Sequence, residues 1–536
     1  MKRNFTDVRK YIKKTTLFIL MILTVTIACQ TEKEDESAEK TDDFAFAEAT
    51  VEEIQAAYDD GSLTAEALVR AYLDRIEAID KNGPNLNSVI TLNPKAIERA
   101  KELDKEMQAG KKRSPMHGIP VLLKDNIDTH DMPTTAGSKA LEGSYPLQDA
   151  YLVKQLRDAG AIILGKANLS EWANFRGELS TSGWSGLGGQ TKNAYDLSRN
   201  PCGSSSGSAV AVSANLTMIA IGTETNGSVV CPSHSNGVVG IKPTVGLVSR
   251  SGIIPISYTQ DTPGPMGRTV RDAAVCLGVM TGADSSDAKT LNSRGKSHSD
   301  YTQFLKKDGL KGKRIGWYKA PSGANFKVDS AMQAAVEFIK SQGAEVVEID
   351  NVTESKTGQY SFQVMLFEYK DGLNKYFKSL GSDAPIKTLE ELIAFNKKDS
   401  TELRYFNQRY LEMAQEKGDL DSDEYKEALK GMLSGSRENG IDKYMKEHNL
   451  DAFMAPTGSP AWKTDLINGD SFQLGSSSPA AHAGYPIITL PMAYIDGLPV
   501  GISFFGTAWS EPVLLEIAYG FESGTKKRQV PKFISE

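Results

Sequence analysis

The segment Gly203–Gly246 limits what this chain can fold into more than any other part of the sequence. It reads GSSSGSAVAVSANLTMIAIGTETNGSVVCPSHSNGVVGIKPTVG, which is rich in glycine, serine and threonine, poor in charge and broken by apolar runs. A flexible linker of this kind would be polar throughout. Glycine allows close approach of the backbone and left-handed angles, and serines held in such surroundings are candidate nucleophiles. The segment therefore predicts an active site built on a buried scaffold.

The composition excludes several classes of protein. A chain of 536 residues with 40% hydrophobic residues predicts a soluble globular protein, and a formal net charge of -7 gives no case for nucleic-acid binding. The cysteines form no CxxC pair and no metal-binding spacing, so we expect no metal site, no cofactor and no disulfide framework. Cys202 and Cys231 are expected to be buried packing residues. The four cysteines are Cys29, Cys202, Cys231 and Cys276.

Residues 1–28 predict an export signal. Basic residues between Lys2 and Lys14 precede the apolar run Thr15–Ala28, whose 14 residues are too few for a membrane-spanning helix but suit a signal peptide. A small residue followed at once by Cys29 resembles the lipobox of bacterial lipoproteins, so we expect lipidation of Cys29. Thr26 departs from the leucine that is usual at its position. The alternative is an ordinary signal peptide, or a short anchor, with an incidental cysteine.

Residues 29–45 predict a disordered tether. The sequence QTEKEDESAEKTDD carries seven acidic residues, two basic residues and no aromatic one, and such a segment cannot bury enough apolar surface to become ordered. The acidic balance of the chain also disfavours docking on anionic lipid. We therefore expect an exported protein that is attached to a bacterial envelope membrane by its lipid alone, with residues 46–536 in solution.

The pattern of apolar residues from residue 46 onward predicts one α/β domain. Residues 118–123 (GIPVLL) are a buried strand candidate, and residues 310–351 combine strand, helix and strand in a βαβ pattern. Residues 51–79 carry helical apolar spacing, and residues 385–449 are mostly amphipathic helix. Because no internal repeat or long linker interrupts this region, we expect a single domain with helical additions.

A serine nucleophile in this chain needs a base and an oxyanion site. None of the six histidines lies in an acid–base context that the sequence makes specific. Lys124 follows the apolar strand candidate directly and precedes Asp-Asn, and burial can lower the pKa of a lysine enough for it to act as a base. Because most lysines at strand ends are solvated, spacing alone does not single out Lys124.

Several motifs, in order, resemble those of the amidase signature family of serine hydrolases. They are GIPVLLKDN, GSSSGS, GTETNGS with GVVGIKPTVG, and the late segment GYPIITLPMAYIDGLPVGISFFG. The similarity covers essentially residues 44–536. RNPCGSSSGSAVAV and GLVSRSGIIPISYTQDTPGPMGRTVRDAA are similar to the bacterial peptide amidase branch. The resemblance implies a single domain in which helices cover both sides of a large mixed central β-sheet.

The resemblance also implies a Ser-Ser-Lys triad. Carried over by position, Ser228 is the nucleophile and Lys124 is the base, while Ser204 bridges the two after a cis peptide bond. Two further positions, Ser206 and Thr223, support the triad by hydrogen bonds. The implied oxyanion hole consists of the backbone N–H groups of Thr225, Asn226, Gly227 and Ser228.

The implied activity is hydrolysis of a carboxamide to a carboxylate and ammonia through an acyl-enzyme. C-terminal peptide amides are the first expectation. Specificity is expected from residues 292–458, and the sequence does not show how these residues pack around a substrate. Small aliphatic, aryl or fatty acyl amides therefore remain open. A lipid-anchored binding protein without turnover also stays open, as does an amidotransferase subunit. Residues 203–207 also satisfy the GxSxG nucleophile elbow of α/β-hydrolases, with His448 or His482 as the partner.

Overall fold

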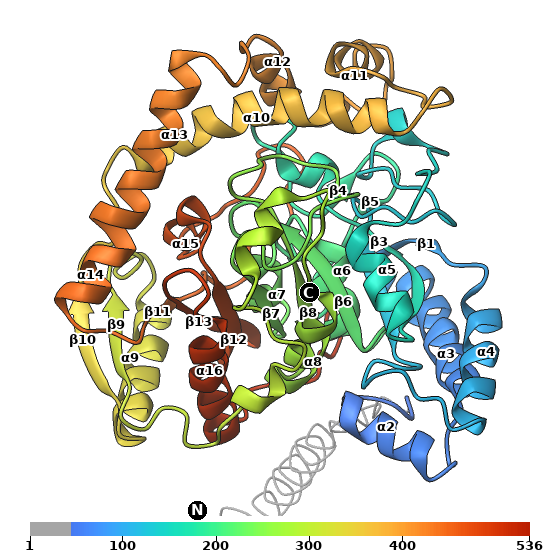
Figure 1. The fold of residues 1–536 in the computed structure, drawn as a ribbon, viewed down its shortest axis with the longest axis horizontal. Coiled ribbons are helices and arrows are strands. Elements are labelled where there is room, and N and C mark those ends of the chain that lie inside the picture. The colour runs from blue at the N-terminus through green and yellow to red at the C-terminus, as the bar shows by residue number, and fades with distance from the viewer. Residues whose placement is uncertain (1–43, 536) are drawn as a thin grey trace, which may run out of the picture. The chain divides into compact units, whose positions relative to one another are not determined.

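A mixed β-sheet of 11 strands forms the centre of the fold (Figure 1). The computed structural model describes residues 44–535, so the expected signal peptide (1–28), Cys29 and most of the acidic tether (29–45) lie outside the described residues. The boundaries of these segments stay predictions. Glu48–Glu536 form one compact unit. The expected single α/β domain around a large mixed sheet is confirmed.

The order of strands in the sheet places β2 between two parallel neighbours, β3 and β6. Strand β9 is likewise parallel to β10 and β11, and the remaining neighbours are antiparallel. Because β2 and β6 run in the same direction, the segments that follow them leave the sheet at the same edge. In order across the sheet, the strands are β1 (Val89–Leu92), β3 (Ile162–Ala167), β2 (Pro120–Lys124), β6 (Ile219–Glu224), β8 (Thr262–Gly267), β7 (Val239–Lys242), β12 (Ile487–Ile495), β13 (Leu498–Phe505), β11 (Ala452–Pro456), β9 (Arg314–Tyr318) and β10 (Glu345–Ile349).

Strands β2, β3 and β6 are buried along their whole length. Parallel strands that are covered on both faces read as continuous apolar runs, and the predicted strand at residues 118–123 is confirmed as β2. Helix α6 (Ser206–Ser213) packs against β2, β3 and β6 and is itself fully buried, while α8 (Val270–Met280) packs against β6, β7 and β8. The Gly203–Gly246 segment therefore supplies a central helix and central strands.

The helical spacing over residues 51–79 forms two helices and a π turn. Gly61, with a positive φ of 76°, lies between the two helices, and each helix begins at a threonine whose side chain accepts from a backbone N–H, Thr50 for the first and Thr64 for the second. These helices are α2 (Val51–Asp59) and α3 (Ala65–Arg75), followed by the π turn Ile76–Lys81. The other helices outside residues 357–447 are α4 (Ala96–Gln108), α5 (Tyr151–Asp158), α7 (Val230–Ser235), α9 (Phe326–Ser341), α15 (Ser478–Ala483) and α16 (Glu511–Thr525).

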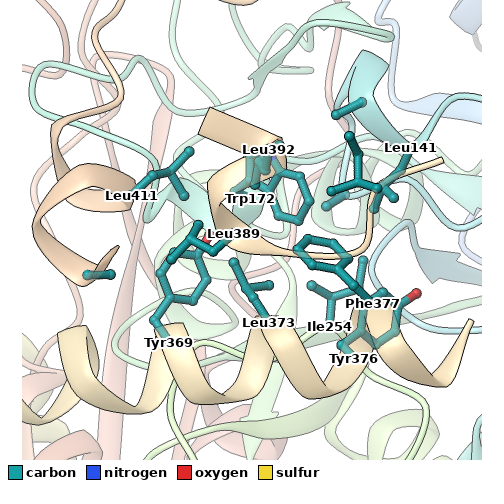
Figure 2. Close-up of a cluster of buried hydrophobic side chains, with 14 of the residues drawn as sticks. Leu141, Trp172, Ile254, Tyr369, Leu373, Tyr376, Phe377, Leu389, Leu392 and Leu411 are labelled. Carbon is teal, nitrogen blue, oxygen red and sulfur yellow. The ribbon is translucent and has the colours of Figure 1, made fainter. Parts of the chain in front are cut away.

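The helices between β10 and β11 form an arm along the top and left of Figure 1, and those after residue 385 confirm the predicted amphipathic region. The arm is joined to the rest of the unit by a cluster of buried side chains, in which Trp172 and Ile254 meet Leu373 and Phe377 of α10 (Figure 2). Because this cluster is apolar and buried, it fixes α10 against the segments around residues 172 and 254. The arm consists of α10 (Thr357–Ser379), α11 (Leu389–Asn396), α12 (Arg409–Gln415), α13 (Asp423–Ser436) and α14 (Asp442–Glu447).

Candidate active site

Lys124 ends β2, and oxygen atoms surround its amine. The side chain is fully buried. Its Nζ donates to Ser204 Oγ at 2.8 Å, to Thr223 Oγ1 at 2.9 Å and to Thr223 O at 3.2 Å. Burial lowers the pKa of Lys124 to about 7, against the attraction of Asp261 and Glu224, which favours the charged form. The amine is therefore partly neutral near pH 7 and can accept a proton.

Ser204 is held rigidly opposite this amine. The Gly203–Ser204 peptide bond is cis, as the family resemblance implied. A Cβ on Gly203 would lie 2.2 Å from Ser170 Oγ, so only glycine fits at this position. The N–H of Ser170 donates to the Ser204 carbonyl at 3.0 Å, and the Ser204 side chain is fully buried. The structure thus brings together Lys124 and Ser204, which are 80 residues apart in the sequence.

Ser228 lies in the turn between β6 and α7. Its carbonyl accepts from the N–H of Ser205 at 3.2 Å, which places the turn beside the segment that carries Ser204. Ser228 is half-buried, whereas Ser204 is fully buried. Within the described residues, the hydroxyl groups of Ser204 and Ser228 do not hydrogen-bond to each other. The turn therefore presents Ser228 as the more accessible serine of the two.

The turn that contains Ser228 offers backbone N–H groups. In the part of the chain that the structure describes, the N–H groups of Asn226, Gly227 and Ser228 donate to no protein acceptor. Gly227 has a φ of +83°, which favours glycine, and Asn226 Oδ1 accepts from Ser477 Oγ at 2.7 Å. Thr225 Oγ1 donates to an Asp261 carboxylate oxygen at 2.6 Å. Anchored side chains and free N–H groups are suited to binding a developing oxyanion.

The two expected supporting residues have different roles in the structure. Thr223 touches the amine of Lys124 directly and also accepts from Asn126 Nδ2 at 3.0 Å. Ser206 does not touch the triad side chains; its Oγ donates to the carbonyl of Cys202 at 2.6 Å and so shapes the segment before Ser204. Sequence reasoning noted the polar residues after Lys124 but assigned Asn126 no role.

Glu224 is a second residue that sequence reasoning missed. One of its carboxylate oxygens accepts from the N–H groups of Val229 and Val230, at 2.8 and 3.1 Å, so it holds the chain just after Ser228 at the start of α7. Glu224 lies inside the GTETNGS motif, but the motif alone does not show that its carboxylate turns back to the following helix. The residue fixes the direction in which the turn leaves β6.

The two cysteines near the site form a disulfide, which corrects the sequence analysis. Cys202 and Cys231 are bonded to each other, with Cα atoms 5.9 Å apart, and the remaining cysteine of the described residues, Cys276, is free and buried. Both bonded residues pack with Trp462. A large core does not need cross-links, but a disulfide can still join two segments of one site.

A cavity of about 390 Å³ opens beside the candidate site. Asn126, Thr223 and Thr225 line one side of it, and its volume is within the usual range of ligand pockets. Asn126 Oδ1 is buried without a hydrogen-bond partner, and burial raises the pKa of Asp261, also in the wall, to about 6. The rest of the lining combines the charged residues Arg250, Asp287 and Lys375 with apolar and aromatic residues, among them Ile253, Ile254, Pro255, Ile256, Tyr258 and Tyr376.

The GxSxG interpretation is wrong. The elbow would make Ser205 the nucleophile, but Ser205 Oγ donates to Thr223 O at 3.1 Å and accepts from Thr223 N at 3.2 Å, with no histidine among its partners in the described residues. His482 lies on α15, where burial lowers its pKa to about 4. Lysine, not histidine, is the candidate base beside the serine cluster.

The described residues contain one cluster with metal-ligand chemistry, formed by His130, Asp131 and Asp149. Arg157 already engages both carboxylates, at 2.7 and 3.0 Å, and His130 Nδ1 lies 2.9 Å from Asp149. The cluster is a set of ion pairs at the surface. Among residues 44–535, no helix has the length and apolar character that crossing a membrane requires.

Comparison with known proteins identifies relatives over almost the whole chain. The Amidase family model matches residues 67–515. The native peptide amidase from Stenotrophomonas maltophilia is 49% identical in sequence to this chain. The structural match covers 91% of this chain and 99% of the peptide amidase chain, with a TM-score of 0.88. A probable amidase of Arabidopsis thaliana is 42% identical over 506 residues (92% of this chain, 93% of its own), and a glutamyl-tRNA(Gln) amidotransferase subunit of Clostridium botulinum is 33% identical over 495 residues (88% and 96%).

The sheet, the match to the family model and these relatives define an enzyme that hydrolyses amide C–N bonds. The chain belongs to the amidase family, the amidase signature family that its motifs predicted. The likeness to a peptide amidase agrees with the branch that the RNPCGSSSGS segment indicated.

Proposed function

We propose that this amidase cleaves carboxamides with Ser228 as the nucleophile, Ser204 as the relay and Lys124 as the base. The observation that carries the proposal is the 2.8 Å contact between Lys124 Nζ and Ser204 Oγ in a fully buried site. A buried amine with a pKa near 7 is matched to proton transfer at neutral pH. The contact between two buried groups beside one more accessible serine supports the proposed triad.

The proposed reaction has two stages. As Ser228 Oγ attacks the amide carbon, its proton passes to Ser204, and the proton of Ser204 passes to the neutral amine of Lys124. The N–H groups of Asn226 and Gly227 hold the oxyanion, and a proton returns through Ser204 as ammonia leaves. Water then attacks the ester along the same route and releases the carboxylate. The two serine hydroxyls come within hydrogen-bonding reach when substrate binds, since catalytic hydrogen bonds often tighten only in the complex.

C-terminal peptide amides are the substrate class that we favour. The 49% identity to a peptide amidase supports this choice, and so does the cavity of about 390 Å³, whose apolar and aromatic lining residues suit a hydrophobic side chain next to the scissile amide. Small aliphatic, aryl and fatty acyl amides fit the same chemistry. The 33% identity to an amidotransferase subunit raises that function as a second candidate, and the export signal expected in residues 1–28 disfavours it.

The substrate class is tested by ammonia release from matched amides. We expect the purified full-length protein in mild detergent to release ammonia from peptide amides with a higher kcat/KM than from free amino acid amides or simple acyl amides. The same peptides with a free carboxylate should give no ammonia, and mass spectrometry should find their internal bonds intact. Ammonia from simple acyl amides but not from peptide amides would reject the peptide assignment, and ammonia from free glutamine alone would favour the amidotransferase.

We also propose that the enzyme is exported and attached to a bacterial envelope membrane through a lipid on Cys29. Support comes from the basic and apolar pattern of residues 1–28 and the acidic tether that follows. The Cys202–Cys231 disulfide adds to it, because disulfides persist outside the reducing cytosol. The anchor would be the lipid, with the amidase unit in solution beside the membrane.

The lipid anchor is tested by metabolic labelling in bacteria. The wild-type chain is expected to incorporate a labelled fatty acid and to sediment with membranes, and Cys29→Ala should do neither. Cys276→Ala is the matched control, because it removes a buried cysteine far along the chain and should keep the label. Equal labelling of the wild type and Cys29→Ala would contradict the anchor.

A further inference from the structure

The Cys202–Cys231 disulfide joins the two segments that carry the proposed reacting serines. Cys202 lies two residues before Ser204, and Cys231 lies three residues after Ser228. The bond therefore closes a loop across a sequence separation of 29 residues, and both serines are inside it. No other described residues cross-link these segments covalently, since this is the disulfide that the structure records for residues 44–535.

The disulfide acts on the backbone at both of its ends. The carbonyl of Cys202 accepts from Ser206 Oγ at 2.6 Å, which fixes the segment that contains Ser204. At the other end, the N–H of Cys231 donates to the carbonyl of Gly227 at 2.7 Å, which fixes the turn next to Ser228. A displacement of either cysteine would move one serine segment relative to the other.

A rigid support lies behind the bond. Trp462 packs on both cysteines, and its Nε1 donates to Asp470 Oδ1 at 3.1 Å. Asn200 donates to the same carboxylate oxygen at 3.3 Å, and its own Oδ1 accepts from the N–H of Cys202 at 2.8 Å. Trp462 also lines a cavity of about 780 Å³. Trp462 and Asn200 thus brace the disulfide.

The position of the bond matters because, in the described part of the chain, no hydrogen bond joins the hydroxyls of Ser204 and Ser228. Lys124 and Ser204 are in hydrogen-bonding contact, but Ser204 and Ser228 are held side by side by a backbone hydrogen bond of 3.2 Å between Ser205 and Ser228. The distance over which a proton must pass between the hydroxyls therefore depends on how the two segments are held. A misplacement of about 1 Å can lower a rate by roughly 10²-fold.

We infer that Cys202 and Cys231 are positioning residues whose disulfide holds Ser204 in register with Ser228, so that acyl transfer depends on the oxidation state of this pair. The inference rests on the proposed function. A dithiol reductant supplies two electrons and two protons: the S–S bond breaks, two thiols form and the dithiol closes to a cyclic disulfide. Because disulfides form after export, the chain would acquire full activity only outside the cytosol.

The test compares oxidised and reduced enzyme without unfolding it. Purified full-length protein is treated with dithiothreitol, the thiols are counted, and folding is followed by circular dichroism and Tm. In folded enzyme with the pair reduced, we expect kcat on peptide amides to fall about 10- to 100-fold while KM changes less than threefold. Reoxidation should restore kcat. The double variant Cys202→Ser/Cys231→Ser should have the low kcat and no response to reductant.

The matched control is Cys276→Ser, which removes the free buried cysteine and should keep both the wild-type kcat and its response to reductant. A second readout, the rate at which a fluorophosphonate probe labels Ser228, does not need the natural substrate. Folded, reduced enzyme that keeps kcat and labelling rate within twofold would overturn the inference, as would losses that only follow the unfolded fraction. Oxidised wild type that neither hydrolyses amides nor reacts with the probe would instead reject the proposed function.

Discussion

Replacing Ser228 with alanine is expected to lower kcat for amide hydrolysis by about 10⁴-fold or more, the scale seen when the nucleophile of a serine hydrolase is removed. The change deletes one hydroxyl from a half-buried turn whose shape is held by Glu224 and Asp261, so the fold should remain. Steady-state ammonia release, with Tm as the check on folding, measures the effect. Ser228→Ala should also lose all labelling by a fluorophosphonate probe.

Ser208→Ala is the control for this loss. Ser208 is a buried serine on α6 whose Oγ donates to Ile221 O at 3.2 Å, away from Lys124 and the turn at Ser228. We expect it to keep kcat within about threefold, because the hydrogen bond it loses is worth only about 1 kcal/mol of stability. Full activity of Ser228→Ala, or equal losses in the two variants, would reject Ser228 as the nucleophile.

The substitution Lys124→Met is expected to have the second large effect. It should lower kcat/KM by about 10²- to 10⁴-fold, which is the usual contribution of a general base. Methionine is similar in length to lysine and carries no charge. Ser204 therefore loses its proton acceptor, while the space that the lysine side chain occupied stays filled. The measurement is kcat/KM against pH for the wild type and the variant.

In the wild type, kcat/KM is expected to rise with pH through the pKa of the base. The base must be neutral, and burial lowers the pKa of Lys124 to about 7. Below this pH the neutral fraction falls tenfold per unit, so log kcat/KM should rise with a slope of one and level off above about pH 7. This rising limb should disappear in Lys124→Met. Lys242→Met is the control, a buried lysine on β7 with a pKa lowered to about 8, and should keep the limb. A limb that persists without Lys124 would contradict its role as the base.

The apolar pattern predicts the central strands well, and the reason is burial. Residues 118–123 read as a continuous apolar run because β2 is covered on both faces, and its end at Lys124 follows directly. The helices of residues 385–449 are equally visible in their periodicity. The break at Gly61 was missed because helical spacing continues on both sides of it.

The partner of Lys124 is not predictable from periodicity. Ser204 lies 80 residues away, just before α6, and meets the lysine because α6 packs against β2 and its neighbours in the sheet. The family resemblance supplied this pairing, not the spacing. The roles of Glu224 and Asn126, and the disulfide, depend on the direction in which side chains leave turns, which neither hydrophobic pattern nor composition records.

The cavity beside the site has walls of two different origins. Part of the lining belongs to the ends of β2 and β6, with Asn126 just after β2 and Thr223 near the end of β6, and another part includes Gly372 and Tyr376 of α10. Helix α10 reaches the cavity from an arm inserted between β10 and β11 (Figure 1). A Cβ on Gly372 would lie 2.8 Å from Pro255, so small changes in this helix alter the space directly. Changes in the arm can therefore reshape the cavity without altering the segments that carry Lys124, Ser204 and Ser228.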